Sequence, residues 1–265
     1  MMKKRMVGIL VAVLILTGCS TVLLTGRRQL ALVSDAEVLT LSDSSYRAFM
    51  ATASVSKKTT QNAMVARVGT RITNAVAAYL QQEGKSDLIN GYEWSFHLVV
   101  DTAVNAFCMP GGKIVVYEGL LPVAQSEAGL AVVIGHEVAH AIAKHSNERM
   151  SQQMATNMGL SMINAAIPQK NALLKTYGPT VLGLGAEYGI MLPYSRKQEY
   201  EADHLGLIFM AMAGYDPSEA LTFWSRMAAN SKTSTPEILS THPSDENRIA
   251  TLQRLLKEAL TYYKK

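Results

Sequence analysis

The sequence has little cysteine, few aromatic residues and few charged ones. Its 265 residues include two cysteines, Cys19 and Cys108, which could form at most one disulfide bond and lie in no spacing typical of a thiolate metal site. A disulfide scaffold and a zinc finger are therefore excluded. Hydrophobic residues make up 48% of the chain, which excludes intrinsic disorder, and the length suffices for one large domain with a buried core.

The chain also lacks a strong net charge of either sign. The formal net charge is +4, and Lys3, Lys4 and Arg5 contribute three of these charges from a short N-terminal stretch without an acidic residue. The remainder of the chain is close to neutral, so bulk charge gives no support to nucleic-acid binding. We expect no nucleic-acid partner.

No apolar segment has the roughly 20 residues that a clear membrane span needs. The N-terminal apolar run covers only residues 6–16 and follows three basic residues, which is the pattern of a secretory signal peptide. A short membrane-anchoring helix is the alternative.

The residues that follow this run are Leu16-Thr17-Gly18-Cys19, which resemble the lipobox of bacterial lipoproteins. The resemblance implies a lipoprotein signal peptide over 1–18, a lipidated tether over 19–34, and membrane attachment through acyl chains on Cys19. Ser20 follows the cysteine, and in a Gram-negative host this implies the outer membrane, facing the periplasm.

Apolar periodicity predicts a mostly α-helical α+β domain over 35–265. Helical spacing covers 35–82, 128–150, 198–212, 218–229 and 247–262. Residues 92–101 alternate as strands do, and 113–117, which follow the turn Pro110-Gly111-Gly112, are a second strand candidate, so the two predict a small antiparallel sheet. The segment 154–193 allows no firm assignment.

The residues His136-Glu137-Val138-Ala139-His140 form the pattern HExxH inside a predicted helix. Residues four apart lie on one helix face, so both imidazoles can reach one metal ion, and Glu137 can take a proton from water there. The flanks 130–135 and 138–143 are apolar, which predicts a buried helix where an unmatched Glu137 would be costly. The alternative is a pair of satisfied core histidines without a metal.

A peptidase-type metal site also needs a third protein ligand. The metzincin pattern is excluded because Ala143 and Ser146 stand where it requires glycine and histidine. Farther along, the pattern ExxxD sets Glu199 and Asp203 on one helix face, with Glu201 pointing elsewhere. One carboxylate could bind the metal while the other holds a ligand histidine in one tautomer. A solvated acidic helix start is the alternative.

Several motifs together resemble peptidase family M48, a family of zinc metallopeptidases. They are HExxH at 136–140, the runs 195–203, 105–114 and 118–121, and the pairs His242-Pro243 and Arg248-Ile249. The resemblance covers about residues 60–255 and is strongest to the soluble-domain branch, which includes the periplasmic lipoprotein peptidases and the catalytic part of the mitochondrial inner-membrane peptidase. It implies a zincin-type fold over 35–265, with the small antiparallel sheet beside the active-site helix.

The resemblance also implies a role for each matching residue. It makes His136, His140 and Glu199 the zinc ligands, Glu137 the base, and Asp203 the partner of a ligand histidine. The remaining matches are His242, which would stabilise the oxyanion or close the metal site, Arg248, which would pair with a carboxylate of the site, and the substrate-binding sheet edge Asn105-Ala106-Phe107. We expect His97, His145 and His204 not to be ligands.

Together these features predict a zinc metalloendopeptidase with one Zn²⁺ per chain, acting on misfolded or unassembled envelope proteins. Two histidines and a glutamate would also accept cobalt or manganese, and zinc is implied by ligand type and family. The alternative function is an outer-membrane client-binding or assembly factor whose metal site is largely closed. The expected partners are polypeptide substrates, the membrane through Cys19, and envelope assembly machinery.

Overall fold

The computed structural model describes residues 19–166, 195–230, 238–239, 242 and 247–264. The predicted signal peptide and most of the unassigned segment 154–193 lie outside these residues. The chain divides into two compact units, one of residues 1–38 and 146–192 and one of residues 39–145 and 193–265. Among the described helices, none combines the length and the hydropathy that crossing a membrane requires.

The first unit contains a hairpin where the sequence predicted a tether. Strands β1 (Cys19–Thr21) and β2 (Arg28–Leu30) pair antiparallel. Arg27 then donates to both carboxylate oxygens of Glu148, at 2.6 and 2.7 Å. Glu148 belongs to helix α6 (His145–Ala166), so a charge-assisted bidentate contact ties the hairpin to this helix.

The second unit is built mainly from helices, and the predicted mostly helical α+β class is confirmed. Its helices are α2 (Asp35–Thr52, from residue 39), α3 (Thr59–Gln82), α4 (Leu121–Ala124), α5 (Glu127–Ile142), α8 (Arg196–Met212), α9 (Glu219–Asn230) and α11 (Arg248–Tyr262), with short 3₁₀ turns η1 (Ser86–Ile89) and η2 (Glu118–Leu120). The α3 positions Val68, Ile72, Val76 and Leu80, predicted from their spacing, are all buried.

The sheet of this unit is mixed, whereas the sequence predicted an antiparallel one. Its strand order is β3 (Ser95–Val99), β5 (Lys113–Tyr117), β4 (Ala106–Met109). Strand β4, which the alternation of apolar residues did not predict, forms an antiparallel hairpin with β5, and β3 pairs with β5 in parallel. The predicted antiparallel orientation was wrong for β3. The chain reverses once between β3 and β4 and again between β4 and β5, so β3 and β5 run in the same direction.

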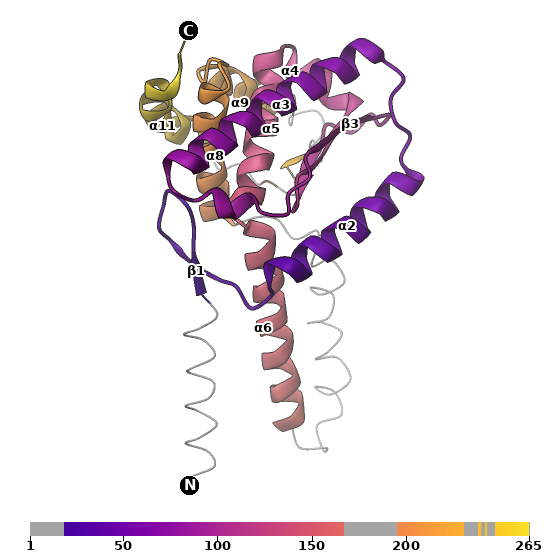
Figure 1. Ribbon diagram of the computed structural model, residues 1–265, viewed down its shortest axis with the longest axis vertical. Helices are drawn as coiled ribbons and strands as arrows, with labels where there is room; N and C mark the ends of the chain where they lie inside the picture. Colours follow the sequence, from indigo (N-terminus) through magenta and orange to yellow (C-terminus); the bar gives the residue numbers. More distant parts are fainter. Residues whose placement is uncertain (1–18, 167–194, 231–237, 240–241, 243–246, 265) are drawn as a thin grey trace. The chain divides into compact units, whose positions relative to one another are not determined.

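Helix α5 is the centre of this unit, and it packs against α8, α3 and strand β4 (Figure 1). Ser126 caps its N-terminus by accepting a hydrogen bond from the Gly129 amide at 3.0 Å. Every residue from Gly129 to Ile142 is buried. The polar side chains of this helix must therefore find partners inside the protein.

Two glycines allow α5 and α8 to approach closely. A Cβ atom added to Gly206 would lie 3.0 Å from the backbone nitrogen of His136, and one added to Gly135 would lie 3.0 Å from the carbonyl oxygen of Gly206. Only glycine avoids crowding on both helices at this crossing. The crossing brings the acidic residues at the start of α8 up to the histidines of α5.

The helix predicted over 128–150 is two helices. Helix α5 ends at Ile142, and α6 begins at His145. Between them Lys144 has a φ of 58°, in the left-handed region that interrupts a right-handed helix. Helix α5 therefore ends two residues after the HExxH motif.

Candidate metal centre

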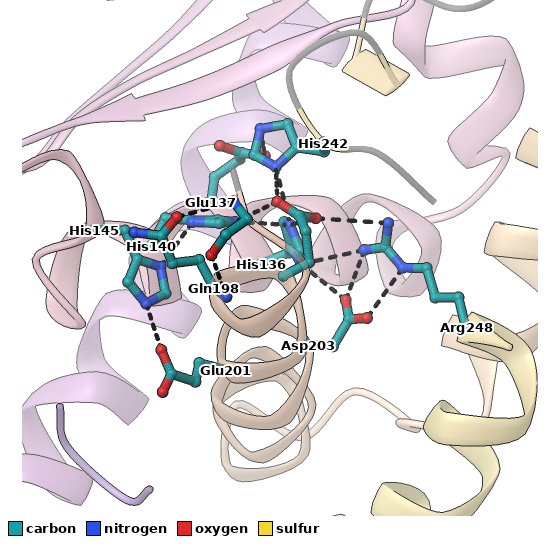
Figure 2. A network of polar contacts seen from close by, with 11 residues as sticks. His136, Glu137, His140, His145, Gln198, Glu201, Asp203, His242 and Arg248 are labelled. Carbon is teal, nitrogen blue, oxygen red and sulfur yellow. Dashed lines mark hydrogen bonds and ion pairs between the residues drawn. The ribbon is translucent and has the colours of Figure 1, made fainter. Parts of the chain in front are cut away.

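The predicted site residues come together inside the second unit from four separate places in the chain. Helix α5 contributes His136, Glu137 and His140, helix α8 contributes Glu199 and Asp203, the segment near 242 contributes His242, and the start of α11 contributes Arg248. None of these residues is more than 5% exposed. The site is therefore a buried polar cluster, and Figure 2 shows it as a connected network of polar contacts.

Four of these side chains aim donor atoms at one point. His136 Nε2 lies 3.0 Å from His140 Nε2 and 3.2 Å from His242 Nδ1. The Glu199 carboxylate oxygens lie 3.4 Å from the Nε2 atoms of His136 and His140, and 3.1 Å from His242 Nδ1. Each residue thus offers one ligand atom within 4.8 Å of the others.

This arrangement fits a tetrahedral metal ion. Zinc–nitrogen bonds of about 2.0–2.1 Å at tetrahedral angles separate ligand atoms by roughly 3.3 Å, close to the 3.0–3.4 Å contacts given above. Among the described residues, Glu199 Oε2 and Glu137 Oε1 are buried and accept no hydrogen bond. A bound cation would give Glu199 Oε2 a partner, and a water beside the cation would give Glu137 Oε1 one.

Burial and charge give the histidines different protonation behaviour. Burial alone disfavours the charged form of His136, but the carboxylates of Asp203 and Glu199 outweigh it and raise the pKa of His136 to about 9. Burial lowers the pKa of His140 well below its usual value. Burial also opposes ionisation of Glu199, yet the three histidines that face its carboxylate, His136, His140 and His242, lower the pKa of this group. Since metal ligands must be deprotonated, metal binding would displace a proton from His136.

Asp203 connects His136 to Arg248. The Nδ1–H of His136 donates to Asp203 Oδ1 at 2.9 Å, while Arg248 donates to both oxygens of Asp203 at 2.7 and 3.0 Å (Figure 2). The Arg248 guanidinium also stacks on Trp224 of helix α9, with its central carbon 3.3 Å from the ring centroid. Asp203 thereby fixes the His136 tautomer that leaves Nε2 available for a metal.

Glu137 lies beside the donor cluster and outside it. Its Oε1 is 3.4 Å from His242 Nε2. Burial, reinforced by the negative charge of Glu199, raises the pKa of Glu137 against the opposing effect of the nearby cations. A carboxyl with a raised pKa can take up and release a proton near neutral pH.

The predicted sheet-edge residues lie at and just before strand β4. Ala106 and Phe107 are in the strand, and Asn105 precedes it, with its side-chain oxygen accepting from the Ala106 amide at 2.9 Å. Among the described strands, β4 pairs with β5 alone, so it is an edge of the sheet next to α5. Farther along the chain, the amide of Ile238 donates to the Val104 carbonyl at 3.2 Å.

Three residues that touch the site were not predicted. Trp224 stacks on Arg248, and His145 and Glu201 extend the network from His140. The only signals in the sequence were the spacing of His145 after HExxH and of Glu201 after Glu199. His97 and His204 take other partners, since His97 contacts Tyr46 and His204 pairs with Glu258.

A mostly helical α+β unit with the HExxH histidines facing a glutamate from a second helix defines a zinc metallopeptidase domain. Comparison with known proteins agrees, and the chain belongs to peptidase family M48, whose model matches residues 61–256. Members of this family use zinc, so the predicted cofactor is supported by both the donor set and the family.

Several relatives carry names that include the activity. The chain is 35% identical over 190 residues to the mitochondrial metalloendopeptidase OMA1 of Schizosaccharomyces pombe, covering 71% of this chain and 53% of the relative. It is 32% identical over 262 residues to the mitochondrial metalloendopeptidase OMA1 of Homo sapiens, covering 96% and 49%. It is 30% identical over 166 residues to the beta-barrel assembly-enhancing protease of Escherichia coli, covering 58% and 33%. The chain spans about half the length of each of the first two relatives and 33% of the length of the third.

Proposed function

We propose that this chain is a zinc-dependent endopeptidase that hydrolyses peptide bonds of envelope proteins, chiefly misfolded or unassembled ones. The observation that carries the proposal is the buried donor cluster of His136, His140 and Glu199 with Glu137 beside it. The names of the relatives support peptide hydrolysis, and the beta-barrel assembly-enhancing protease supports an envelope substrate.

In this proposal His136, His140 and Glu199 hold one zinc ion, and Asp203 with Arg248 keeps His136 in the correct tautomer. Bound zinc supplies Lewis acidity that polarises the scissile carbonyl and makes a neighbouring water acidic. Glu137 would take a proton of that water on its carboxylate as the water oxygen bonds to the scissile carbonyl carbon, and burial, which raises the pKa of Glu137, favours the protonated form. Glu137 then transfers the proton to the leaving amine as the peptide bond breaks.

The substrate would bind as an added strand along β4. The edge residues Asn105, Ala106 and Phe107 stand beside α5, so a peptide paired there passes the donor cluster. Backbone hydrogen bonds give such pairing affinity with little sequence preference. This favours extended, unfolded polypeptides over folded proteins.

His242 would close the site in the observed conformation. Its Nδ1 completes a set of four protein donors, whereas a catalytic zinc site keeps one position open. The Ile238 amide, four residues earlier, bonds to the backbone just before the edge strand. The same closure supports the second candidate function, a client-binding or assembly factor whose metal site is largely closed.

Replacing His242 by alanine tests the closure. We expect kcat/KM on an unfolded protein substrate to rise by about tenfold, as for an enzyme whose competent state is populated about one time in ten. The matched control is His204→Ala, a histidine that pairs with Glu258 outside the donor cluster and whose loss should leave the rate unchanged. A lower kcat at unchanged KM would instead assign His242 to the oxyanion.

We further propose that Cys19 is lipidated and that the protein is an outer-membrane lipoprotein facing the periplasm. The support is the LTGC sequence and the serine after it. Residues 1–18 would be the signal peptide and 19–34 the lipidated segment leading into the peptidase domain. Metabolic labelling with a fatty-acid analogue should mark the parent and not Cys19→Ala, and label on both proteins would refute the proposal.

The peptidase proposal is tested on protein that begins at Ser20 and is purified without chelators. We expect one zinc per chain and cleavage of casein that stops on adding a chelator and returns with stoichiometric zinc. Zinc without cleavage in both the parent and His242→Ala would favour the client-binding function. Absence of bound metal would refute the ligand assignment.

A further inference from the structure

His140 is held by a chain of buried polar side chains that ends on helix α8. Its Nδ1 lies 2.8 Å from His145 Nδ1, and His145 Nε2 lies 3.0 Å from Glu201 Oε2 (Figure 2). His145 is fully buried and Glu201 is 2% exposed. Histidine and glutamate are costly to bury unless they are paired, so both side chains need a reason to be there.

The turn between α5 and α6 makes the contact with His140 possible. In a continuous α-helix a residue five positions after His140 would point about 140° away from it around the axis. The left-handed conformation of Lys144 ends α5 and directs His145 back onto His140. This conformation is unfavourable for a residue with a side chain, and such strain persists only where the surrounding structure requires it.

If His140 binds a metal, the direction of the two hydrogen bonds that link His140, His145 and Glu201 is fixed. His140 Nε2 faces the donor cluster and must keep its lone pair for the metal, so the proton of His140 is on Nδ1. His145 Nδ1 lies 2.8 Å from this proton-bearing nitrogen, so it must accept the hydrogen bond and carry no proton itself. The proton of His145 is then on Nε2, where Glu201 accepts it.

We infer that His145 and Glu201 are positioning residues that fix the tautomer and orientation of the zinc ligand His140. The inference rests on the proposed function, because it takes His140 as a ligand. The two ligand histidines then have parallel supports: Asp203 acts on His136 directly, and Glu201 acts on His140 through the ring of His145. The Glu201 carboxylate is one imidazole farther from the metal than the Asp203 carboxylate. Removing Glu201 should therefore lower zinc affinity less than removing Asp203 does.

The test is zinc affinity, measured by competition with a chromogenic chelator. We expect His145→Leu to bind zinc about 10–100-fold more weakly than the parent, the effect typical of losing the partner of a ligand histidine. His145→Asn retains an oxygen acceptor near the Nδ1 position and should recover most of the affinity. Glu201→Gln should lie between the parent and His145→Leu. The absorption spectrum of the cobalt-substituted protein should change in His145→Leu and return in His145→Asn.

A second measurement reads the tautomers directly. Long-range proton–nitrogen correlation spectra of the zinc-loaded parent should show His140 protonated on Nδ1 and His145 protonated on Nε2. The spectrum needs no substitution, so it decides the matter even if His145→Leu fails to fold. Protonation of His145 on Nδ1 would overturn the inference.

The controls separate this inference from the proposed function. His97→Asn, a change on β3 at a histidine that contacts Tyr46, should leave zinc affinity unaltered. If the parent binds one zinc, His136→Ala binds none, and folded His145→Leu matches the parent within twofold, the positioning role is refuted while the metal site stands. A parent that binds no zinc would refute both.

Discussion

Replacing Glu137 by glutamine is expected to lower the rate of peptide hydrolysis by about 10²–10⁴-fold, the usual contribution of a general acid–base residue. Glutamine keeps the shape of the side chain but cannot accept or release the proton. The variant should still bind one zinc per chain, because Glu137 lies outside the set of four donors. Metal content and casein cleavage, measured on the same preparations, check both halves of the expectation.

The matched control for this change is Glu258→Gln, which alters a carboxylate on α11 that pairs with His204. It should leave cleavage unaltered. Cleavage by Glu137→Gln at the parental rate would exclude Glu137 as the base, and loss of zinc from it would make Glu137 part of the metal-binding set. A variant that loses cleavage but restores full function in cells would favour the client-binding role.

Replacing Arg248 by methionine is expected to destabilise the metal-free protein by about 3–5 kcal/mol, the effect of leaving one partner of a buried ion pair uncompensated. Arg248 donates two hydrogen bonds to Asp203, and both residues are 5% exposed. Methionine preserves the apolar contact with Trp224 and removes the charge. Denaturant unfolding in the presence of a chelator measures the loss.

This destabilisation should depend on pH. Burial opposes ionisation of Asp203, but Arg248 and His136 outweigh it and keep the pKa of this carboxyl below its usual value. A depressed pKa means that the stabilisation is present above the unfolded-state value of about 3.9 and is lost as the pH falls through the folded-state pKa. The difference between parent and variant should therefore shrink in acid.

Two variants distinguish the ion pair from general damage to helix α11. Arg254→Met removes an exposed arginine from the same helix and should change stability by less than about 0.5 kcal/mol. Asp203→Asn combined with Arg248→Met removes both charges and should recover much of the lost stability. Equal stability of the single and double variants would contradict the ion-pair explanation.

Local patterns were sufficient to predict the centre of the site. The HExxH spacing places His136 and His140 one helical turn apart, and the ExxxD spacing does the same for Glu199 and Asp203. The structure brings both pairs together in one buried cluster. Helix geometry relates residues within a turn, so such pairs can be predicted without knowing the rest of the fold.

Other contacts had no local signal. Nothing in the spacing of Trp224 and Arg248 indicates that one stacks on the other, because they belong to different helices. The parallel pairing of β3 with β5 depends on the path of the chain between them, which alternation of apolar residues does not specify. His145 was expected not to be a ligand, and its contact with His140 depends on the left-handed conformation of Lys144, which no spacing indicates.

The sequence by itself determined the class of the domain and the HExxH and ExxxD pairs of the candidate metal site, because these follow from short-range spacing and residue chemistry. Only the tertiary structure decided how α5 and α8 cross at Gly135 and Gly206, where Lys144 interrupts the helix, and which side chains contact His136 and His140. These features arise from close packing between segments far apart in the chain, and their energies depend on neighbours that no local pattern names.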